Sequence, residues 1–534
     1  MLTIIFFILL LIIILFYFVY GSFLSKNFHI DDSRPTPSQT MGDGVDYVPA
    51  HKAVLFGHHF SSIAGAGPII GPIIAGISFG WLPAMIWIVI GSIFIGGVHD
   101  FSVLTASIRH RGDSIANIAR RYINERGRKL FLLFVWFALI YVIAIFADIT
   151  AETFVDNGGI ATSSIFYILL AILFGLSIYK FKLQMFKVST IFVILVFLGI
   201  WFGQFLPVTL PSKKIWTVIL LVYCFFASVL PVWFLLQPRD YLSSYLLYAS
   251  VLAGIVGILC GRFDIKSSAF KGFHSAEMGY LFPILFITVA CGAISGFHSL
   301  VASGTTSKQI SRESHARFIA YGGMLLEGII ALIALSGVMM FSGDFLKGKQ
   351  PMEVYSLAMG NFFKKIGLSS NFGTAFGFLA VSAFVLTTLD TATRIARYVL
   401  QEFLGGIEKV NRFFATFITL IIPTILVFLE FKDPSGKVIP AWKAIWPAFG
   451  TSNQLLAALA LLTVYAWLRR NKWKTLHVLF PMIFMLITTL TALVLLILKF
   501  KFSIVGVIAI LLFLLAVFLL FDTVFPGVYN KKNE

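Results

Sequence analysis

Long unbroken runs of apolar residues constrain this chain more than any other feature. Residues 1–20 and 130–146 carry no charged side chain, and similar runs recur along the sequence. A helix of about 20 apolar residues crosses the hydrocarbon core of a bilayer while it satisfies its own backbone hydrogen bonds. A membrane-spanning barrel would alternate apolar and polar residues over segments of about ten. The runs therefore predict an all-α, polytopic membrane protein.

Composition supports lipid as the solvent of this chain. Of the 534 residues, 59% are hydrophobic and only 12% are charged, whereas soluble domains carry about 25% charged residues. We therefore assign the net charge of +17 to loops and expect no nucleic-acid partner. Cys224, Cys260 and Cys291 lie in apolar segments without a CxxC pair, which favours packing roles over a disulfide or zinc site. We expect no metal and no cofactor.

Hydropathy predicts about fifteen spans with short polar connections. The longest connections, 25–53, 262–279 and 342–372, are too short for an independent soluble core. The predicted spans are 2–24, 54–78, 80–108, 127–152, 161–180, 186–206, 213–237, 243–261, 280–302, 315–341, 373–400, 412–430, 448–467, 475–498 and 502–525.

The distribution of basic residues predicts the orientation. If the basic loop 109–129 is cytoplasmic and the spans alternate, about two thirds of the 41 Lys and Arg residues fall on the cytoplasmic side, as the positive-inside rule requires. The N-terminus is then outside and the C-terminus is cytoplasmic, in a bacterial inner membrane.

The second predicted span contains an unusual density of helix breakers. Residues 57–72 hold four glycines and two prolines, among them Gly65, Gly67 and Pro68. Proline removes an amide donor, so the backbone should unwind, and unwound backbone is tolerated at membrane depth only inside protein or beside a cavity. Such broken helices form substrate and ion sites in secondary transporters. A kinked packing helix is the alternative.

Two further spans depart from a plain apolar helix. Residues 230–241 contain Pro231 and Pro238 on either side of Trp233, which predicts a break or an ordinary proline kink. Residues 290–307 are rich in hydroxyl and small side chains, including Ser295 and His298. Small residues permit close helix packing, whereas hydroxyl oxygens and freed carbonyls suit a hard cation or a carboxylate solute.

Acidic residues inside predicted spans are candidates for ion coupling, because buried charge is costly and points to function. Asp100, Glu327 and Asp390 lie within spans, and Glu327 is the most isolated of them along the sequence. Asp390 is four residues from Arg394, so the two can instead form a neutral structural pair on one helix face. For Glu327 two roles stay open, that of a proton carrier and that of a residue buried in its neutral form.

Four histidines at membrane depth allow several interpretations. His58 and His59 are adjacent, so on a continuous helix they point about 100° apart. With His99 and His298 they could form a metal cluster, but solute binding or pH sensing is favoured, and purely structural roles stay open.

The same segments closely resemble the carbon starvation protein A family of bacterial peptide and pyruvate transporters, from about residue 48 to 460. The chain looks shorter than the largest members. The matching words are His58-His59-Phe60 through Pro72, Leu230-Pro231-Val232-Trp233, Pro238-Arg239-Asp240-Tyr241-Leu242, residues 282–309, Asp390-Thr391 with Thr393-Arg394, Trp446-Pro447 with Phe449-Gly450, and Asn453-Gln454-Leu455-Leu456-Ala457.

The resemblance implies the five-plus-five inverted-repeat fold of leucine-transporter-like proteins. Mapped by order alone, residues 1–53 form a leading helix and loop, 54–206 the first repeat, 213–400 the second, and 401–534 about four trailing helices and a tail. The hydroxyl-rich segment with Ser303, Thr305 and Thr306 then lies where relatives hold a coupling cation. The implied substrates are short peptides or pyruvate.

Three functions therefore compete. A secondary importer driven by protons or sodium is favoured, because no nucleotide-binding loop of the GxxxxGK[ST] type is present. A membrane-embedded metal hydrolase would use His58, His59 and an aspartate, but the HExxH spacing is missing. A nutrient-binding sensor would need a signalling domain, which the sequence does not show. The oligomeric state is left open.

Overall fold

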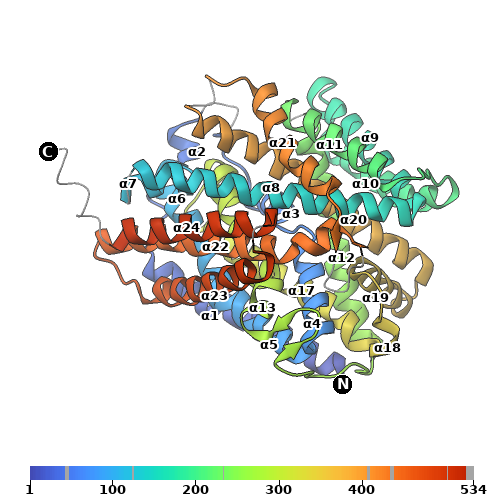
Figure 1. Ribbon diagram of the computed structural model, residues 1–534. Coiled ribbons are helices and arrows are strands. Elements are labelled where there is room, and N and C mark those ends of the chain that lie inside the picture. The colour runs from blue at the N-terminus through green and yellow to red at the C-terminus, as the bar shows by residue number, and fades with distance from the viewer. Residues whose placement is uncertain are drawn as a thin grey trace.

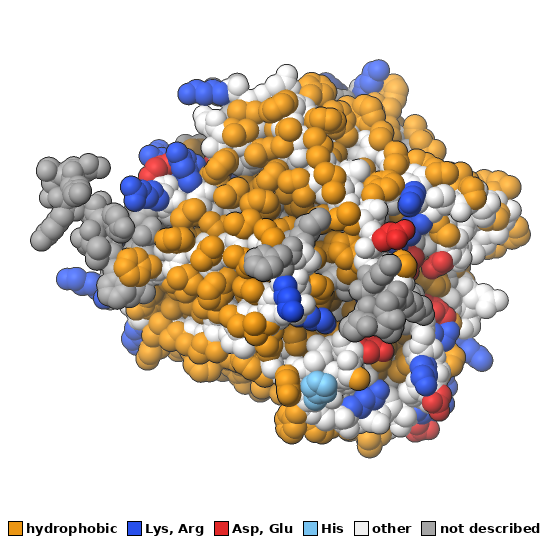
Figure 2. Space-filling view, viewed as in Figure 1, with side chains coloured by type: hydrophobic (Ala, Val, Ile, Leu, Met, Phe, Trp, Pro, Cys, Tyr) orange, Lys and Arg blue, Asp and Glu red, His pale blue; other side chains and the backbone are white. Residues whose placement is uncertain are grey.

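The computed structural model describes residues 1–42, 47–122, 125–231, 234–405, 409–432, 438–501 and 503–524, which are almost entirely helical (Figure 1). Hydrophobic side chains cover most of the face in Figure 2, and most of its charged side chains lie toward the edges. This distribution is the reverse of a water-soluble surface and confirms the prediction of an all-α, multi-pass membrane protein.

Within the described ranges, ten helices are long and apolar enough to cross a membrane. They are α1 (Leu2–Asn27), α5 to α6 (Trp81–Arg109), α8 (Glu125–Asp156), α9 with its π-helical end (Gly158–Lys180), α10 (Met185–Phe205), α12 (Leu236–Gly261), η4 with α17 (Arg317–Met340), α20 (Ser370–Phe403), α22 (Ala441–Arg470) and α23 (Leu476–Phe500).

An eleventh span is the bent pair α3 (Lys52–Ile63) and α4 (Gly67–Phe79), whose axes differ by 47°. The expected span 280–302 consists of three short helices, α13 (Leu281–Thr288), α14 (Ala290–Ala293) and α15 (Gly296–Val301). The remaining expected spans hold α11 (Lys213–Val229), α21 (Arg412–Phe428) and α24 (Ile504–Val524), which fall short of the same limits. All fifteen ranges therefore contain helix, but a count of fifteen spans is not confirmed.

The long helices α8 and α20 cross the middle of the molecule and pack against each other (Figure 1). Most of their residues are buried, as are most of α17 and α22, whereas most apolar side chains of α1 and α10 are exposed or only partly buried. The chain thus has an inner set of helices covered by peripheral ones, and the polar residues described below lie on the inner set.

The connections contain more structure than the sequence predicts. In the polar stretch 342–372 the helix α19 (Pro351–Lys365) packs against α12 and α20, and its apolar face is buried. The remaining short elements are α2 (Pro37–Thr40), α7 (Ile115–Tyr122), α16 (Ser307–Gln309), α18 (Gly343–Leu346) and two antiparallel strand pairs, β1 (His274–Ser275) with β2 (Gly279–Tyr280) and β3 (Phe431–Lys432) with β4 (Val438–Ile439).

Four turns of π-helix interrupt the described helices. They are η1 (Ser92–Gly96) between α5 and α6, η2 (Leu176–Lys180) at the end of α9, η3 (Ala302–Thr306) after α15 and η4 (Arg317–Tyr321) before α17. Single π-turns inside α-helices occur frequently at functional sites. Three of these four adjoin the helices that carry the buried acids and the central histidine.

Candidate functional site

The first break separates α3 from α4 at residues 64–66, as the glycines and prolines predict. Gly65 and Gly67 allow other helices to approach closely: a Cβ on Gly65 would lie 2.5 Å from Thr388 Oγ1 of α20, and one on Gly67 would lie 2.4 Å from Cys291 Sγ. Pro68 opens α4, where a missing amide donor costs nothing. In this conformation the two glycines provide packing space, and their role in substrate binding remains a prediction.

The second break lies at residues 294–295, between α14 and α15, where both residues have extended backbone angles. Asn453 of α22 stabilises it, because its Oδ1 accepts a hydrogen bond of 2.9 Å from the Phe297 amide and its Nδ2 lies 3.1 Å from the Ser295 hydroxyl. The side chain of Asn453 therefore replaces part of the missing helical hydrogen bonding. Since Gly67 packs on Cys291 of α14, the two breaks lie side by side.

A fully buried chain of acidic and imidazole groups adjoins the second break. His298 of α15 lies between two carboxylates: its Nδ1 is 2.7 Å from Asp100 Oδ2 of α6, and its Nε2 is 3.0 Å from Glu327 Oε2 of α17. The other Asp100 oxygen is 2.7 Å from His99 Nδ1. All four side chains are completely inaccessible to solvent. Glu327, the most isolated of the three acids along the sequence, is thus in contact with His298 in the folded chain.

The charges of Asp100, His298 and Glu327, called the trio below, do not balance on their own. A protonated His298 compensates one of the two carboxylates, which leaves one negative charge unless Glu327 or Asp100 carries a proton. Neither Glu327 oxygen makes a hydrogen bond of standard geometry within the described residues. Buried charge without a partner is strongly unfavourable. One further proton would therefore make the trio neutral, and Glu327, whose only ion-pair contact among the described residues is His298, can carry it.

The adjacent histidines of α3 have separate surroundings, as the helical spacing predicts. His59 Nδ1 lies 2.8 Å from Thr306 Oγ1, and the carbonyl of His58 accepts hydrogen bonds from Ser61 and Ser62. His59 is buried, and its Nε2 has no hydrogen-bond partner within the described part of the chain. Among the same residues no three His, Cys, Asp or Glu side chains form a metal-ligating group.

The hydroxyl groups of the predicted cation site have different partners. Ser303 Oγ accepts from the Ile115 amide at 3.1 Å, Thr305 donates to the carbonyl of Val301, and Thr306 contacts His59 as described. Ser303 also donates to Ser299 of its own helix turn. A common cation site for Ser303, Thr305 and Thr306 remains a prediction.

Asp390 of α20 belongs to a second buried polar cluster. It forms an ion pair with Arg239 of α12 and accepts a hydrogen bond of 2.7 Å from Tyr223 of α11. The expected pairing with Arg394 is wrong, because Arg394 donates instead to the carbonyls of Ala227 and Leu230. Trp233, a predicted substrate contact, lies outside the described residues.

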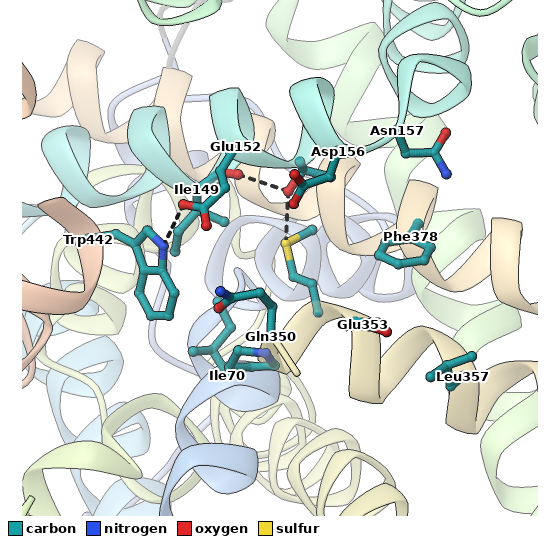
Figure 3. Close-up of a pocket in the computed structure, with 13 residues that line it drawn as sticks. Ile70, Ile149, Glu152, Asp156, Asn157, Gln350, Glu353, Leu357, Phe378 and Trp442 are labelled. Atoms are coloured by element: carbon teal, nitrogen blue, oxygen red, sulfur yellow. Dashed lines mark hydrogen bonds between the residues drawn. The ribbon is translucent and has the colours of Figure 1, made fainter. Parts of the chain in front are cut away.

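A cavity of about 380 Å³ opens between α8, α19 and α22 (Figure 3). Its wall carries the carboxylates of Glu152, Asp156 and Glu353, and the Trp442 indole donates a hydrogen bond of 2.9 Å to Glu152. Ile70 of α4 also lines it. Apart from Ile70, these residues all belong to ends and connections that the charge distribution predicts to be outside.

On the predicted cytoplasmic side, charged contacts join the end of α6, the connection after α16 and the linker after α1. Glu313 follows α16, is buried, and pairs with Arg109 at the end of α6. It also accepts from the Asp31 amide, so the linker after α1 is attached at the same point. The chain after the second broken segment is therefore tied to α6 on the predicted cytoplasmic side, and the first broken segment reaches the cavity on the predicted outer side through Ile70.

Two broken spans around a buried acid–imidazole site define a polytopic helical membrane protein of the transporter type. The chain belongs to the family Carbon starvation protein CstA, which it matches over residues 1–353 and 340–492.

Several members are similar along most of the chain. The peptide transporter CstA of Campylobacter jejuni is 32% identical over 89% of this chain and 77% of its own length. The peptide transporter CstA of Bacillus subtilis is 34% identical over 84% of this chain and 82% of its own length. The pyruvate/proton symporter BtsT of Escherichia coli is 29% identical over 88% of this chain and 78% of its own length.

Among solved structures, MhsT in complex with L-phenylalanine is similar with a TM-score of 0.48 and 15% identity, covering 89% of this chain and 99% of that one. A mutant of the manganese transporter of Eremococcus coleocola has a TM-score of 0.45 and 15% identity, covering 90% and 97%.

Sequence reasoning missed two site residues. Asn453 lies in a predicted span, and two adjacent amides, Asn453 and Gln454, at membrane depth are a signal that could have identified it. Arg239 falls between the predicted spans 213–237 and 243–261, although α12 begins at Leu236 and buries it completely.

Proposed function

We propose that this chain is a secondary importer of short peptides or small carboxylates such as pyruvate across the bacterial cytoplasmic membrane, driven by protons. The observation that carries the proposal is the position of His298 between Asp100 and Glu327, directly after the second break. The names of the relatives, which include a peptide transporter and a pyruvate/proton symporter, support the same class.

The proton acts by changing the charge of the buried trio. With a proton on Glu327, the pair of Asp100 and protonated His298 is neutral, and the three helices α6, α15 and α17 can move without carrying an uncompensated charge through the membrane. Without that proton the trio carries one negative charge. The three helices then stay in a conformation in which water or a cation can reach the trio. Glu327 and Asp100 are the coupling residues, whereas the ion pair with Arg239 favours a structural role for Asp390.

The order of elements supports an internal repeat. A broken segment (α3–α4, or α13–α15) is followed by a span with a π-turn (α5–α6, or η4–α17), a short helical connection, a very long helix (α8, or α20) and two further spans (α11–α12, or α21–α22). The repeats then cover residues 52–261 and 281–470, with the α9–α10 hairpin inserted in the first.

Packing supports the same division. α12 packs on α3 and α20 of the two repeats, and α22 packs correspondingly on α15 and α8. α11 and α21 both pack against α8 and α20, and they contact each other. This division differs from the one expected by order alone, 54–206 and 213–400, and leaves α1 leading and α23 and α24 trailing.

The test is uptake into sealed proteoliposomes that contain the purified chain. Labelled L-alanyl-L-alanine and labelled pyruvate are offered separately under an inward proton gradient, an inward sodium gradient, or neither. We expect accumulation above equilibrium with the proton gradient and its loss when a protonophore is added. Accumulation that requires sodium alone would overturn the choice of ion, and binding without accumulation would favour the sensor over the importer.

A further inference from the structure

We propose, on the basis of the transport function above, that the outer cavity is a binding site for the protonated amino group of the arriving solute. The cavity has the mixed lining typical of small-molecule sites, with apolar walls and a few polar groups at defined positions. Its volume of about 380 Å³ leaves room for a molecule of dipeptide size.

The polar groups of the lining include three acids. Glu152, Asp156 and Glu353 contribute carboxylates, and among the described residues no Lys or Arg side chain belongs to the wall. Figure 2 shows the acidic side chains of this face mainly at its right-hand side, where α19 lies in Figure 1. A concave surface of one sign concentrates solutes of the opposite charge and repels anions.

Nearby basic residues compensate only part of this charge. Lys213, which does not line the cavity, bridges Glu152 and Asp148 at 2.9 Å each, and Lys349 pairs with Glu353. Asp156 has no ion pair in the part of the chain that the structure describes. In that part, four carboxylates thus face two ammonium groups, which leaves a net negative charge for a cationic ligand to neutralise.

The remaining lining suits the rest of such a solute. Trp442 and Phe378 present aromatic rings beside the carboxylates (Figure 3), and an aromatic face attracts an ammonium group. The hydrogen bond from the Trp442 indole to Glu152 fixes ring and carboxylate relative to each other. Met352 and Leu357 add apolar surface for a side chain.

The cavity also reaches the first broken helix. Ile70 is three residues beyond Gly67, which corresponds to about 4.5 Å along a helix axis. A solute held by its amino group in the cavity therefore lies next to the start of α4, with its other end directed at the break. An anion without an amino group, such as pyruvate, gains nothing from the carboxylates and is repelled by them.

The experiment compares L-alanyl-L-alanine with its N-acetyl derivative, which keeps the carboxylate and loses the ammonium group. For the unaltered protein we expect the N-acetyl compound to compete for dipeptide uptake far less well than the free dipeptide. Asp156→Asn and Glu353→Gln should each raise KM for the dipeptide about two- to fivefold with little change in kcat, the size typical of partly exposed charge pairs. The double variant should lose the discrimination.

Matched controls are Asp344→Asn and Glu277→Gln, which remove exposed acids that do not line the cavity; KM should not change. Equal competition by both compounds in the unaltered protein, or unaltered discrimination in the double variant, would overturn the inference while uptake itself stands. Uptake of pyruvate without any dipeptide uptake would do the same. If neither solute accumulates, the importer proposal fails instead.

Discussion

The carboxylate of Asp390 on α20 is paired with the guanidinium of Arg239 on α12, 151 residues away along the chain, and not with Arg394 one helical turn further on. Both partners are completely buried. Tyr223 donates to the same carboxylate, and Arg239 also contacts Asp240. The cluster joins α11, α12 and α20 at one point, so it fixes the position of the long central helix relative to the spans beside it.

Breaking this pair from one side should destabilise the protein strongly. Asp390→Asn removes one of the two buried carboxylates that pair with the Arg239 guanidinium, and breaking a buried ion pair typically costs about 3–5 kcal/mol. The triple variant Asp390→Leu, Arg239→Met and Asp240→Asn removes all three charges of the cluster and should recover much of that loss. Thermal unfolding in detergent measures both. If Asp390→Asn unfolds like the unaltered protein but abolishes proton-driven uptake, Asp390 is a coupling residue after all.

Replacing Glu327 should separate proton coupling from solute movement. Glu327→Gln mimics the protonated residue, so the trio stays neutral as long as His298 is protonated and Asp100 is ionised. We expect accumulation driven by a proton gradient to disappear, while exchange of labelled against unlabelled solute continues and loses its dependence on pH. Glu277→Gln, at an exposed acid outside the cavity, is the matched control and should keep the coupling. Normal proton-driven accumulation by Glu327→Gln would exclude Glu327 as the carrier.

Adding a single methyl group at the first break should disturb the packing of the two broken segments. In Gly67→Ala the new Cβ lies 2.4 Å from Cys291 Sγ, and overpacking of this kind costs about 1–3 kcal/mol. Cys291→Gly in the same chain removes the clashing atoms and should restore part of the stability. Gly304→Ala is the control, since no described atom lies within 4 Å of its new Cβ. Equal melting temperatures for Gly67→Ala and Gly304→Ala would contradict the close approach.

Asn453 should matter more for the second break than its place in an apolar helix suggests. Asn453→Ala leaves the Phe297 amide without its acceptor, and an unsatisfied buried donor costs about 1–3 kcal/mol. We expect a lower melting temperature together with weaker uptake. Asn471→Ala, which removes a hydrogen bond at a solvent-exposed helix end, should change neither. Unaltered stability of Asn453→Ala would mean that α22 does not hold the break.

The orientation of the chain can be tested with single cysteines in a background without native ones. Lys271→Cys, between α12 and α13, should react with a membrane-impermeant maleimide added to intact cells. Lys474→Cys, between α22 and α23, should react only after the membrane is permeabilised. The reverse pattern would invert the predicted topology and place the cavity on the cytoplasmic side.

Local sequence signals predicted the helices and both confirmed breaks, because hydropathy and helix breakers act within one span. They could not predict which side chains meet. Glu327 seemed isolated because His298 is 29 residues away along the chain. Arg239 looked like a loop residue because a charged side chain lowers the averaged hydropathy, so the predicted span ends before it. Only the pairing with Asp390 makes a buried arginine tolerable at that depth. α19 was missed because its apolar face is diluted by polar residues on the other side.

The π-turns at 92–96, 302–306 and 317–321 each contain one residue more than an ordinary helical turn. A relative that lacks one residue at such a place can close the bulge into regular helix while the flanking faces keep their directions. In an alignment, a gap of one is therefore expected to fall inside these three windows. The same deletion within the regular part of α17 would rotate everything beyond it by about 100° and turn Glu327 away from His298.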